Sequence, residues 1–259
     1  MVQPQLIDKC CNTPATENTA WENLGEDKVL AIKIQGEDRK TYRTGPKDSK
    51  IGIIGVYDIL GFHPTTYQFY DRLAKAHGGF QVSVPHMFKT GSVPAEHLGS
   101  RSAMVSWLDV HGSYSVSHLD ELIMAAVEDL RADGCEQFVI YGQCWGTYIA
   151  IQAASDERQP FLAAGGPHPS MMSAELIEKV RCPIILLPTI EDMDMLPLMD
   201  IMKEKNLKIE SFHHRFGNMH HGWTGCRGDW NIPEQFEAGQ QAIHMLAEFA
   251  EKAVNANKA

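Results

Sequence analysis

The stretch FVIYGQCWGTYIAIQAA, residues 138–154, decides the fold that we expect for this chain. Residues 138–141 are apolar, β-branched and aromatic, which indicates a strand buried on both faces. Residues 142–146 then match the pattern in which two glycines flank a central nucleophile, and helical spacing follows as far as Ala154. Strand, sharp turn and helix therefore follow one another directly.

Cys144 stands at the centre of this predicted turn. Glycines at 142 and 146 let strand and helix approach closely, while the central residue is held in a strained backbone conformation. The partial positive charge at the start of a helix favours a thiolate, so Cys144 is a candidate nucleophile. The alternative is an inert buried cysteine, because the pattern is short and free cysteines are common in cores.

Length and charge narrow the class of protein. The chain has 259 residues, of which 44% are hydrophobic, and we expect an irregular arm over residues 1–25 and one α/β domain over residues 26–259. A net charge of −10 argues against nucleic acid or an anionic membrane as partner. The sequence lacks a signal peptide pattern and a membrane-spanning apolar run, so we expect a cytoplasmic protein.

The cysteines and histidines do not form a metal-binding pattern. No C-x-x-C pair occurs, and the histidines near the C-terminus form adjacent doublets at 213–214 and 220–221. We therefore expect free thiols, no metal and no organic cofactor. The six cysteines are Cys10, Cys11, Cys135, Cys144, Cys182 and Cys226.

Strand and helix patterns alternate along the chain. Strands are predicted at 29–34, 51–57, 80–84, 138–141, 161–164, 184–187 and 208–212. Helices are predicted at 66–76, 117–131, 145–154, 174–180 and 234–253. Residues 86–113 form an irregular insertion with a short helix, which we expect to cover the active site. This alternation predicts a mostly parallel central sheet flanked by helices on both faces.

Active sites of such sheets lie at the carboxyl ends of the strands. After the strand that ends at residue 187 comes an acidic segment, 188–194, and after residue 212 comes a histidine-rich segment, 213–223. Nucleophile, acid and histidine thus occur in the chain order of the α/β-hydrolase fold. In such a triad the imidazole takes the proton of the nucleophile and the carboxylate orients the imidazole.

The chain resembles the dienelactone hydrolases (carboxymethylenebutenolidases), especially their fungal and other eukaryotic members. The resemblance covers most of the chain and depends on several motifs in the family's order, including the N-terminal Cys10-Cys11 pair. The longer motifs are VYDILG at 56–61, VPHMFKTG at 84–91, GQCWG at 142–146, PHPS at 167–170 and HGWTGCRGDW at 221–230.

The resemblance implies a set of site residues. It makes Cys144 the nucleophile and His221 the general base, with Asp192 as the acid and Asp194 as the rival candidate. It implies that Asp58 controls the protonation of the thiol and that the backbone N–H groups of Ile59 and Trp145 form the oxyanion hole. It implies Arg227, and secondarily Arg101, as the group that binds a substrate carboxylate; alternatively, Arg227 pairs with Asp229 at the surface.

The expected function is therefore a cysteine hydrolase that opens a small anionic lactone or enol ester through a thioester on Cys144. The protein is expected to act as a monomer or homodimer. Departures from the family at His86, Gln143 and Thr147 bear on the substrate rather than on the reaction. An alternative is a binding or sensing protein that keeps the fold without turnover, and a further one is a thiol-redox role for Cys144 and Cys226.

Overall fold

The computed structural model describes residues 15, 16 and 21–258, and Cys10 and Cys11 lie outside the described residues. An eight-stranded sheet with the order β1-β2-β4-β3-β5-β6-β7-β8 forms its centre. The strands are β1 (Glu26–Ile34), β2 (Glu37–Thr44), β3 (Ile51–Val56), β4 (Gln81–Pro85), β5 (Gln137–Gly142), β6 (Phe161–Pro167), β7 (Ile184–Leu187) and β8 (Phe212–His213).

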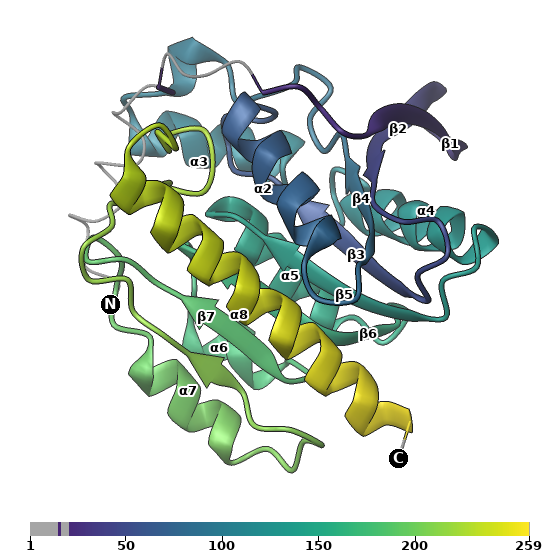
Figure 1. The fold of residues 1–259 in the computed structure, drawn as a ribbon. Coiled ribbons are helices and arrows are strands. Elements are labelled where there is room, and N and C mark those ends of the chain that lie inside the picture. The colour runs from purple at the N-terminus through teal and green to yellow at the C-terminus, as the bar shows by residue number, and fades with distance from the viewer. Residues whose placement is uncertain (1–14, 17–20, 259) are drawn as a thin grey trace.

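Helices cover both faces of the sheet, as predicted. Figure 1 shows α2 and α8 side by side across one face, while α4 and α5 pack against the opposite face. The helices are α2 (Pro64–Lys75), α3 (Arg101–His111), α4 (Leu119–Ala132), α5 (Trp145–Ser155), α6 (Ala174–Glu178), α7 (Leu196–Lys203) and α8 (Pro233–Lys258), with a short 3₁₀ turn, η1 (Ala95–His97).

Six strands that neighbour one another in the sheet in the order β4-β3-β5-β6-β7-β8 run parallel, which confirms the prediction of a mostly parallel sheet. β2 was not predicted, because its sequence EDRKTYRT is mostly polar or charged. It pairs antiparallel with both β1 and β4, and it buries Tyr42 and the stem of Arg39. α7 was also not predicted, and the strand predicted at 208–212 is only two residues long, at Phe212–His213.

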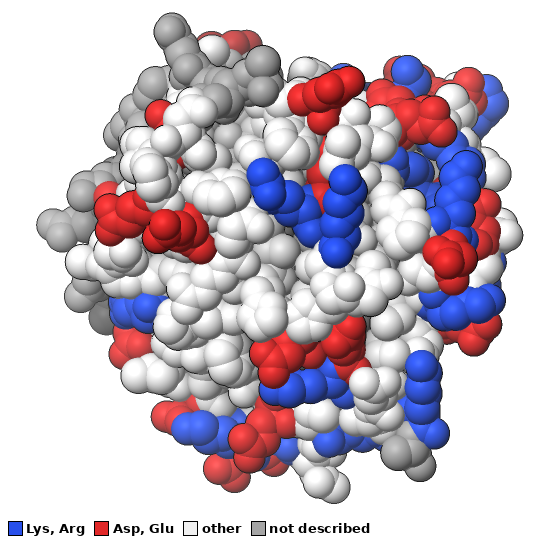
Figure 2. Space-filling view, in the orientation of Figure 1, with Lys and Arg blue, Asp and Glu red and all other residues white. Residues whose placement is uncertain are grey.

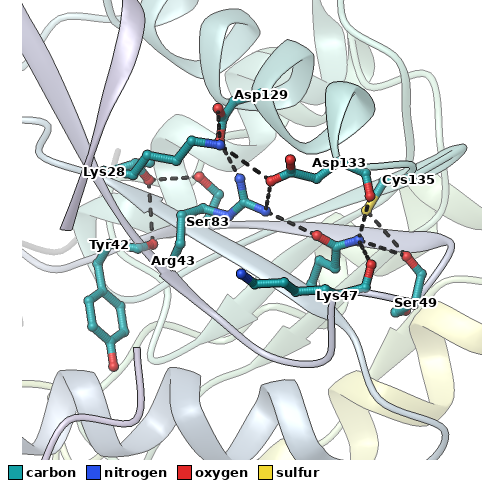
Figure 3. A network of polar contacts seen from close by, with 11 residues as sticks. Lys28, Tyr42, Arg43, Lys47, Ser49, Ser83, Asp129, Asp133 and Cys135 are labelled. Carbon is teal, nitrogen blue, oxygen red and sulfur yellow. Dashed lines mark hydrogen bonds and ion pairs between the residues drawn. The ribbon is translucent and has the colours of Figure 1, made fainter. Parts of the chain in front are cut away.

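A polar network joins the antiparallel edge of the sheet to α4 (Figure 3). The Arg43 guanidinium on β2 binds the carboxylates of Asp129 and Asp133 on and after α4, and it also bonds to Gln81 on β4 at 3.0 Å. Lys28 on β1 lies 2.7 Å from Asp129. Because Arg43 and Asp129 are nearly buried, these contacts fix the edge more firmly than exposed ion pairs would.

A second polar anchor holds residues 21–25 against α2. The carboxylate of Asp71 is fully buried and accepts hydrogen bonds from the Trp21 indole (2.8 Å), the Leu24 N–H (3.0 Å) and the Tyr42 hydroxyl (2.7 Å). A buried carboxylate is stable when several donors satisfy its oxygens. The described part of the N-terminal arm is therefore irregular in backbone but fixed in position.

The charged side chains are interspersed on the face of the molecule that Figure 2 shows. Acidic and basic residues lie beside one another toward the rim, and much of the centre is uncharged. The net charge of −10 is therefore not gathered into one surface on this face.

The turn between β5 and α5 is possible only because its two glycines lack side chains. A Cβ on Gly142 would lie 2.0 Å from the backbone of Gly146, and a Cβ on Gly146 would lie 2.3 Å from the Val56 carbonyl oxygen. These are backbone atoms, so a flexible side chain cannot move aside to relieve the clash. The backbones of β3, β5 and α5 therefore meet in direct contact beneath Cys144.

Replacing Gly146 by Ala is expected to lower the free energy of unfolding by about 2–3 kcal/mol, because the new methyl group overpacks this contact. Urea unfolding followed by circular dichroism measures the change. Gly217→Ala is the matched control: a Cβ there would meet no atom within 4 Å. Its stability should stay within about 0.5 kcal/mol of wild type. Equal midpoints for the two variants would contradict the packing described here.

Candidate active site

Cys144 lies in a strained turn, as the glycine pattern predicts. Its φ of 56° and ψ of −119° fall outside the regions that residues with side chains usually adopt. The loop after β6 holds this backbone from both directions. The Cys144 N–H donates to the Pro167 carbonyl (3.4 Å) and the Cys144 carbonyl accepts from the Ser170 N–H (3.3 Å). The Ser170 hydroxyl also lies 3.6 Å from the Cys144 sulfur.

The His221 imidazole lies between a carboxylate and the thiol. Its Nδ1 is 2.5 Å from Oδ1 of Asp192, its buried Nε2 makes no hydrogen bond with the described residues, and its ring interacts electrostatically with Cys144. Burial by itself would lower the pKa of His221, but the Asp192 carboxylate and then the Cys144 thiolate outweigh it and raise this pKa well above its ordinary value. This arrangement favours an imidazolium–thiolate pair.

Asp192 is positioned by contacts of its own. Its second oxygen accepts hydrogen bonds from the Thr189 N–H (2.7 Å) and the Thr189 hydroxyl (2.9 Å). Arg215 donates to the backbone carbonyls of Thr189 and Asp192, at 3.1 and 2.6 Å. Burial alone would raise the pKa of Asp192, but His221 and the Thr189 N–H hold this pKa below its ordinary value. Asp192 therefore stays ionised beside His221.

The rival acid, Asp194, points elsewhere. It is exposed, and its carboxylate accepts a hydrogen bond from the Leu196 N–H (3.0 Å) at the start of α7. Glu191 contacts the backbone of His221, where its carboxylate accepts from the His221 N–H at 3.0 Å. Asp192 is thus the carboxylate that faces the His221 ring.

Asp58 is a second buried carboxylate near the thiol. Its oxygens accept hydrogen bonds from the N–H groups of Leu60 (2.8 Å) and Cys226 (3.0 Å). Burial, followed by the charge of the Cys144 thiolate, raises the pKa of Asp58 to about 6. The coupling is reciprocal, so an ionised Asp58 makes the Cys144 thiolate harder to form.

The backbone N–H groups of Ile59 and Trp145 come from the two loops beside the thiol. Trp145 is the first residue of α5, where an N–H group has no acceptor within its own helix. The Ile59 peptide is held by the Val93 N–H, which donates to the Ile59 carbonyl at 2.8 Å. Val93 belongs to the 86–113 insertion, so the insertion helps to fix this side of the site.

The insertion also packs on the residue after Cys144. The Phe88 ring stacks on the Trp145 indole with centroids 4.6 Å apart, and Trp107 on α3 meets Phe88 edge-on at 5.1 Å. These three aromatic side chains are buried. The predicted cover over the sheet is therefore joined to the nucleophile turn by an apolar contact.

The two candidate arginines differ in their surroundings. The stem of Arg227 packs against Gly222, the residue after His221, where a Cβ would lie 3.1–3.4 Å from its carbons. Its Nε and Nη1 are buried and bond to no partner among the described residues. Arg101 is the first residue of α3, and no hydrogen bond or ion pair links it to the other candidates in the described chain.

The sequence did not suggest a role for His168 or Thr224, and it connected Gln143 only with the substrate. His168 is fully buried, its Nε2 lies 2.8 Å from the Thr224 hydroxyl, and its ring centroid is 4.9 Å from that of His221. Gln143 bonds to the backbone and hydroxyl of Thr224 at 2.6 and 3.2 Å. The sequence feature that could have pointed to His168 is its position. His168 directly follows β6, at the edge of the sheet where the other site residues lie.

No group of three or more His, Cys, Asp or Glu side chains capable of holding a metal ion is found among the described residues. Over the same residues, no helix has the length and apolar character needed to cross a membrane.

Comparison with known proteins identifies the family. Residues 40–250 match the model of the dienelactone hydrolase family. An uncharacterized AIM2 family protein of Schizosaccharomyces pombe is 27% identical over 246 residues, which cover 90% of this chain and 95% of that protein. The chain belongs to the dienelactone hydrolase family.

Solved structures agree on the fold. A putative dienelactone hydrolase from Klebsiella pneumoniae is similar with a TM-score of 0.57 and 16% identity, over 85% of this chain and 99% of that one. The acylaminoacyl peptidase of Pyrococcus horikoshii is similar with a TM-score of 0.59 and 14% identity over 88% of this chain, which spans only 42% of the peptidase. The protein has the α/β-hydrolase fold, as its sequence predicts.

Asp58 is expected to make stability depend on pH. Its pKa of about 6 in the folded protein exceeds its ordinary value, so the folded state binds the proton more tightly than the unfolded state does. The resulting stabilisation is complete below about pH 4 and is lost as the pH rises past about 6, a change of about 3 kcal/mol. Asp58→Asn should remove this dependence.

Urea unfolding between pH 4 and pH 7 measures the difference between wild type and variant. The free energy of unfolding of Asp58→Asn, relative to wild type, should increase across this range. The exposed Asp194 supplies the control, because Asp194→Asn should follow the wild-type profile. Parallel profiles for wild type and Asp58→Asn would show that Asp58 titrates normally.

Proposed function

We propose that this protein is a cysteine-dependent hydrolase that opens a small carboxylate-bearing lactone or enol ester. The observation that carries the proposal is the placement of the His221 imidazole between the Asp192 carboxylate and Cys144 at the strained turn before α5. Membership of a hydrolase family supports the same reaction class. Cys144 is the nucleophile, His221 the acid and base, and Asp192 the group that orients His221.

The first half of the reaction forms a thioester. The Cys144 thiolate attacks the carbonyl carbon, and the negative charge moves to the carbonyl oxygen near the N–H groups of Ile59 and Trp145. The C–O bond of the ester then breaks, and the leaving enolate or alkoxide takes the proton of the His221 imidazolium. For a lactone the acyl and leaving groups remain in one molecule, tethered to Cys144.

The second half releases the product. Neutral His221 removes a proton from water, the hydroxide adds to the thioester carbonyl, and the C–S bond breaks to regenerate the thiolate. Asp58 regulates how readily the thiol ionises before substrate arrives, because the two groups share one buried region and repel each other when both are charged.

Arg227 is the proposed site for the substrate carboxylate. Arg227 is half-buried, its two buried and unpartnered nitrogens have hydrogen bonds to offer, and its stem packs against Gly222, the residue after His221. A carboxylate can accept two parallel hydrogen bonds from such a fork, which orients it as well as attracts it. Substrates with a carboxylate close to the scissile ester therefore fit this site.

Cys144→Ala and His221→Ala are each expected to reduce kcat/KM for a panel of aryl acetates and dienelactones at least about a thousandfold, because each removes a group that reacts. Cys135→Ala and His118→Asn, which lie away from the site, are the matched controls and should retain turnover within about twofold. Wild-type turnover that persists in both site variants would overturn the proposal. A stable stoichiometric adduct on Cys144, detected by intact mass, would instead identify a binding protein.

The binding of the substrate carboxylate by Arg227 is tested with a dienelactone and its methyl ester, in which the negative charge of the carboxylate is removed. Arg227→Met should raise KM for the acid by about tenfold to a hundredfold and leave KM for the methyl ester nearly unchanged, since a charged hydrogen-bonded pair is lost. Arg181→Met, at an exposed surface ion pair, is the control. Equal effects on acid and ester would show that Arg227 does not bind the carboxylate.

A further inference from the structure

His168 is held against the nucleophile by its backbone. The residue before it accepts a hydrogen bond from the Cys144 N–H, and Ser170, two residues after it, donates to the Cys144 carbonyl. The His168 N–H donates to the Leu187 carbonyl at 2.9 Å. Its φ of 39° lies in the left-handed region, where a residue with a side chain persists only if its surroundings enforce it. The fold therefore forces this imidazole into a defined place.

The hydrogen bonds of Gln143 favour one tautomer of His168. The side-chain nitrogen of Gln143 must face Thr224, because it lies 2.6 Å from the Thr224 carbonyl oxygen, which can only accept. The same nitrogen donates to the Thr224 hydroxyl oxygen at 3.2 Å. The hydroxyl proton of Thr224 is then free to be donated to Nε2 of His168, 2.8 Å away. In this arrangement Nε2 accepts, and a neutral His168 carries its proton on Nδ1.

Nδ1 of His168 is buried and makes no hydrogen bond, to nitrogen, oxygen or sulfur, with the described residues. Burial lowers the pKa of His168 to about 4, and the interaction of the ring with Cys144 raises this pKa too little to offset it. The imidazole therefore stays neutral at pH 7. With Nε2 occupied by Thr224, Nδ1 is the nitrogen left to meet the Cys144 sulfur.

We propose that His168 is a second catalytic histidine, which remains neutral and donates its Nδ1–H to the Cys144 sulfur whenever the sulfur carries negative charge. Thr224 and Gln143 are positioning residues that keep the proton on Nδ1. No proton moves between His168 and the sulfur. The hydrogen bond is strongest to the thiolate and weakest to the thioester, so His168 favours ionisation of the thiol and departure of the thiolate from the thioester.

The consequence for turnover rests on the proposed function, but the effect on the thiol is measured without substrate. The titratable groups that face Cys144 are Asp58, His221 and His168, with Cys226 beside Asp58. Variants at Thr224 leave all of these in place. The pH dependence of iodoacetamide alkylation of Cys144, followed on its own peptide by mass spectrometry, therefore isolates the effect of the tautomer.

Thr224→Val keeps the volume of the side chain and removes the hydroxyl, whereas Thr224→Ser keeps the hydroxyl. For Thr224→Val, we expect the apparent pKa of the Cys144 thiol to rise by about one unit and alkylation at pH 7 to slow about tenfold. Thr224→Ser should stay within about twofold of wild type. If Thr224→Val and Thr224→Ser both show the same alkylation profile as the wild-type protein, the proposal is overturned.

A second pair of variants tests His168 itself. Asparagine can place an N–H near the position of Nδ1 and tolerates a positive φ, while glutamine reaches toward Thr224 instead. His168→Asn should therefore retain more of the alkylation rate than His168→Gln. The reverse order, or equal wild-type rates, would contradict a donor at Nδ1.

The tautomer can also be read in the unaltered protein. Nitrogen-15 spectra of the full chain, with histidines assigned by comparison with His168→Asn, should show His168 as the Nδ1–H form from pH 5 to pH 8. An Nε2–H form, or protonation near pH 6.5, would overturn the proposal even if no Thr224 variant folds. If the wild-type protein hydrolyses no ester but these thiol and tautomer results hold, the proposed function fails and the role of His168 stands.

Discussion

The close approach of three backbones beneath Cys144 is the constraint on which the site depends. Gly142 and Gly146 let α5 start directly against β3, and side chains at either position would overlap backbone atoms. The strained turn that results is stabilised from outside, by hydrogen bonds between Cys144 and the loop that follows β6. The same contact that presents the thiol thus brings the β6 loop, and with it His168, to the sulfur.

Around this turn the protein surrounds one sulfur with groups that act in opposite directions. Asp58 disfavours the thiolate, and its own pKa is raised by burial and then by repulsion between the two negative charges. His221, supported by Asp192, favours the thiolate as an ion pair. His168 is kept neutral by burial, so it can contribute a hydrogen bond but no charge. The reactivity of Cys144 is therefore a balance that can shift when a substrate displaces water or brings a carboxylate.

The residues that depart from the family pattern have separate physical roles. The Thr147 hydroxyl donates to the Gly142 carbonyl at 2.7 Å and so reinforces the turn itself. Gln143 orients Thr224 behind the site. His86 lies 3.0 Å from Asp27 and packs on Phe62, at the antiparallel end of the sheet. Of these three residues, only Thr147 and Gln143 lie next to the nucleophile turn, and both make their contacts with the protein itself.

The sequence by itself determined the elements with strong apolar patterns. The buried strands, the nucleophile turn and the long helices could be predicted because burial on both faces of a parallel sheet leaves an uninterrupted apolar run. β2 could not, because its polar side chains are satisfied by partners far away in the chain, such as Asp129 for Arg43. α7 and the extent of β8 were likewise decided by packing rather than by local pattern.

The candidate site divides in the same way. Cys144, the acidic segment and the histidine doublet follow strands, so their meeting at one edge of the sheet was predictable from the order of elements. The choice between Asp192 and Asp194 depends on the direction of the two side chains, and only the tertiary structure places Asp192 at 2.5 Å from His221. The contacts of His168 are also tertiary, since Thr224 and Cys144 are 56 and 24 residues away from it. A local sequence pattern carries no information about hydrogen bonds between such distant residues.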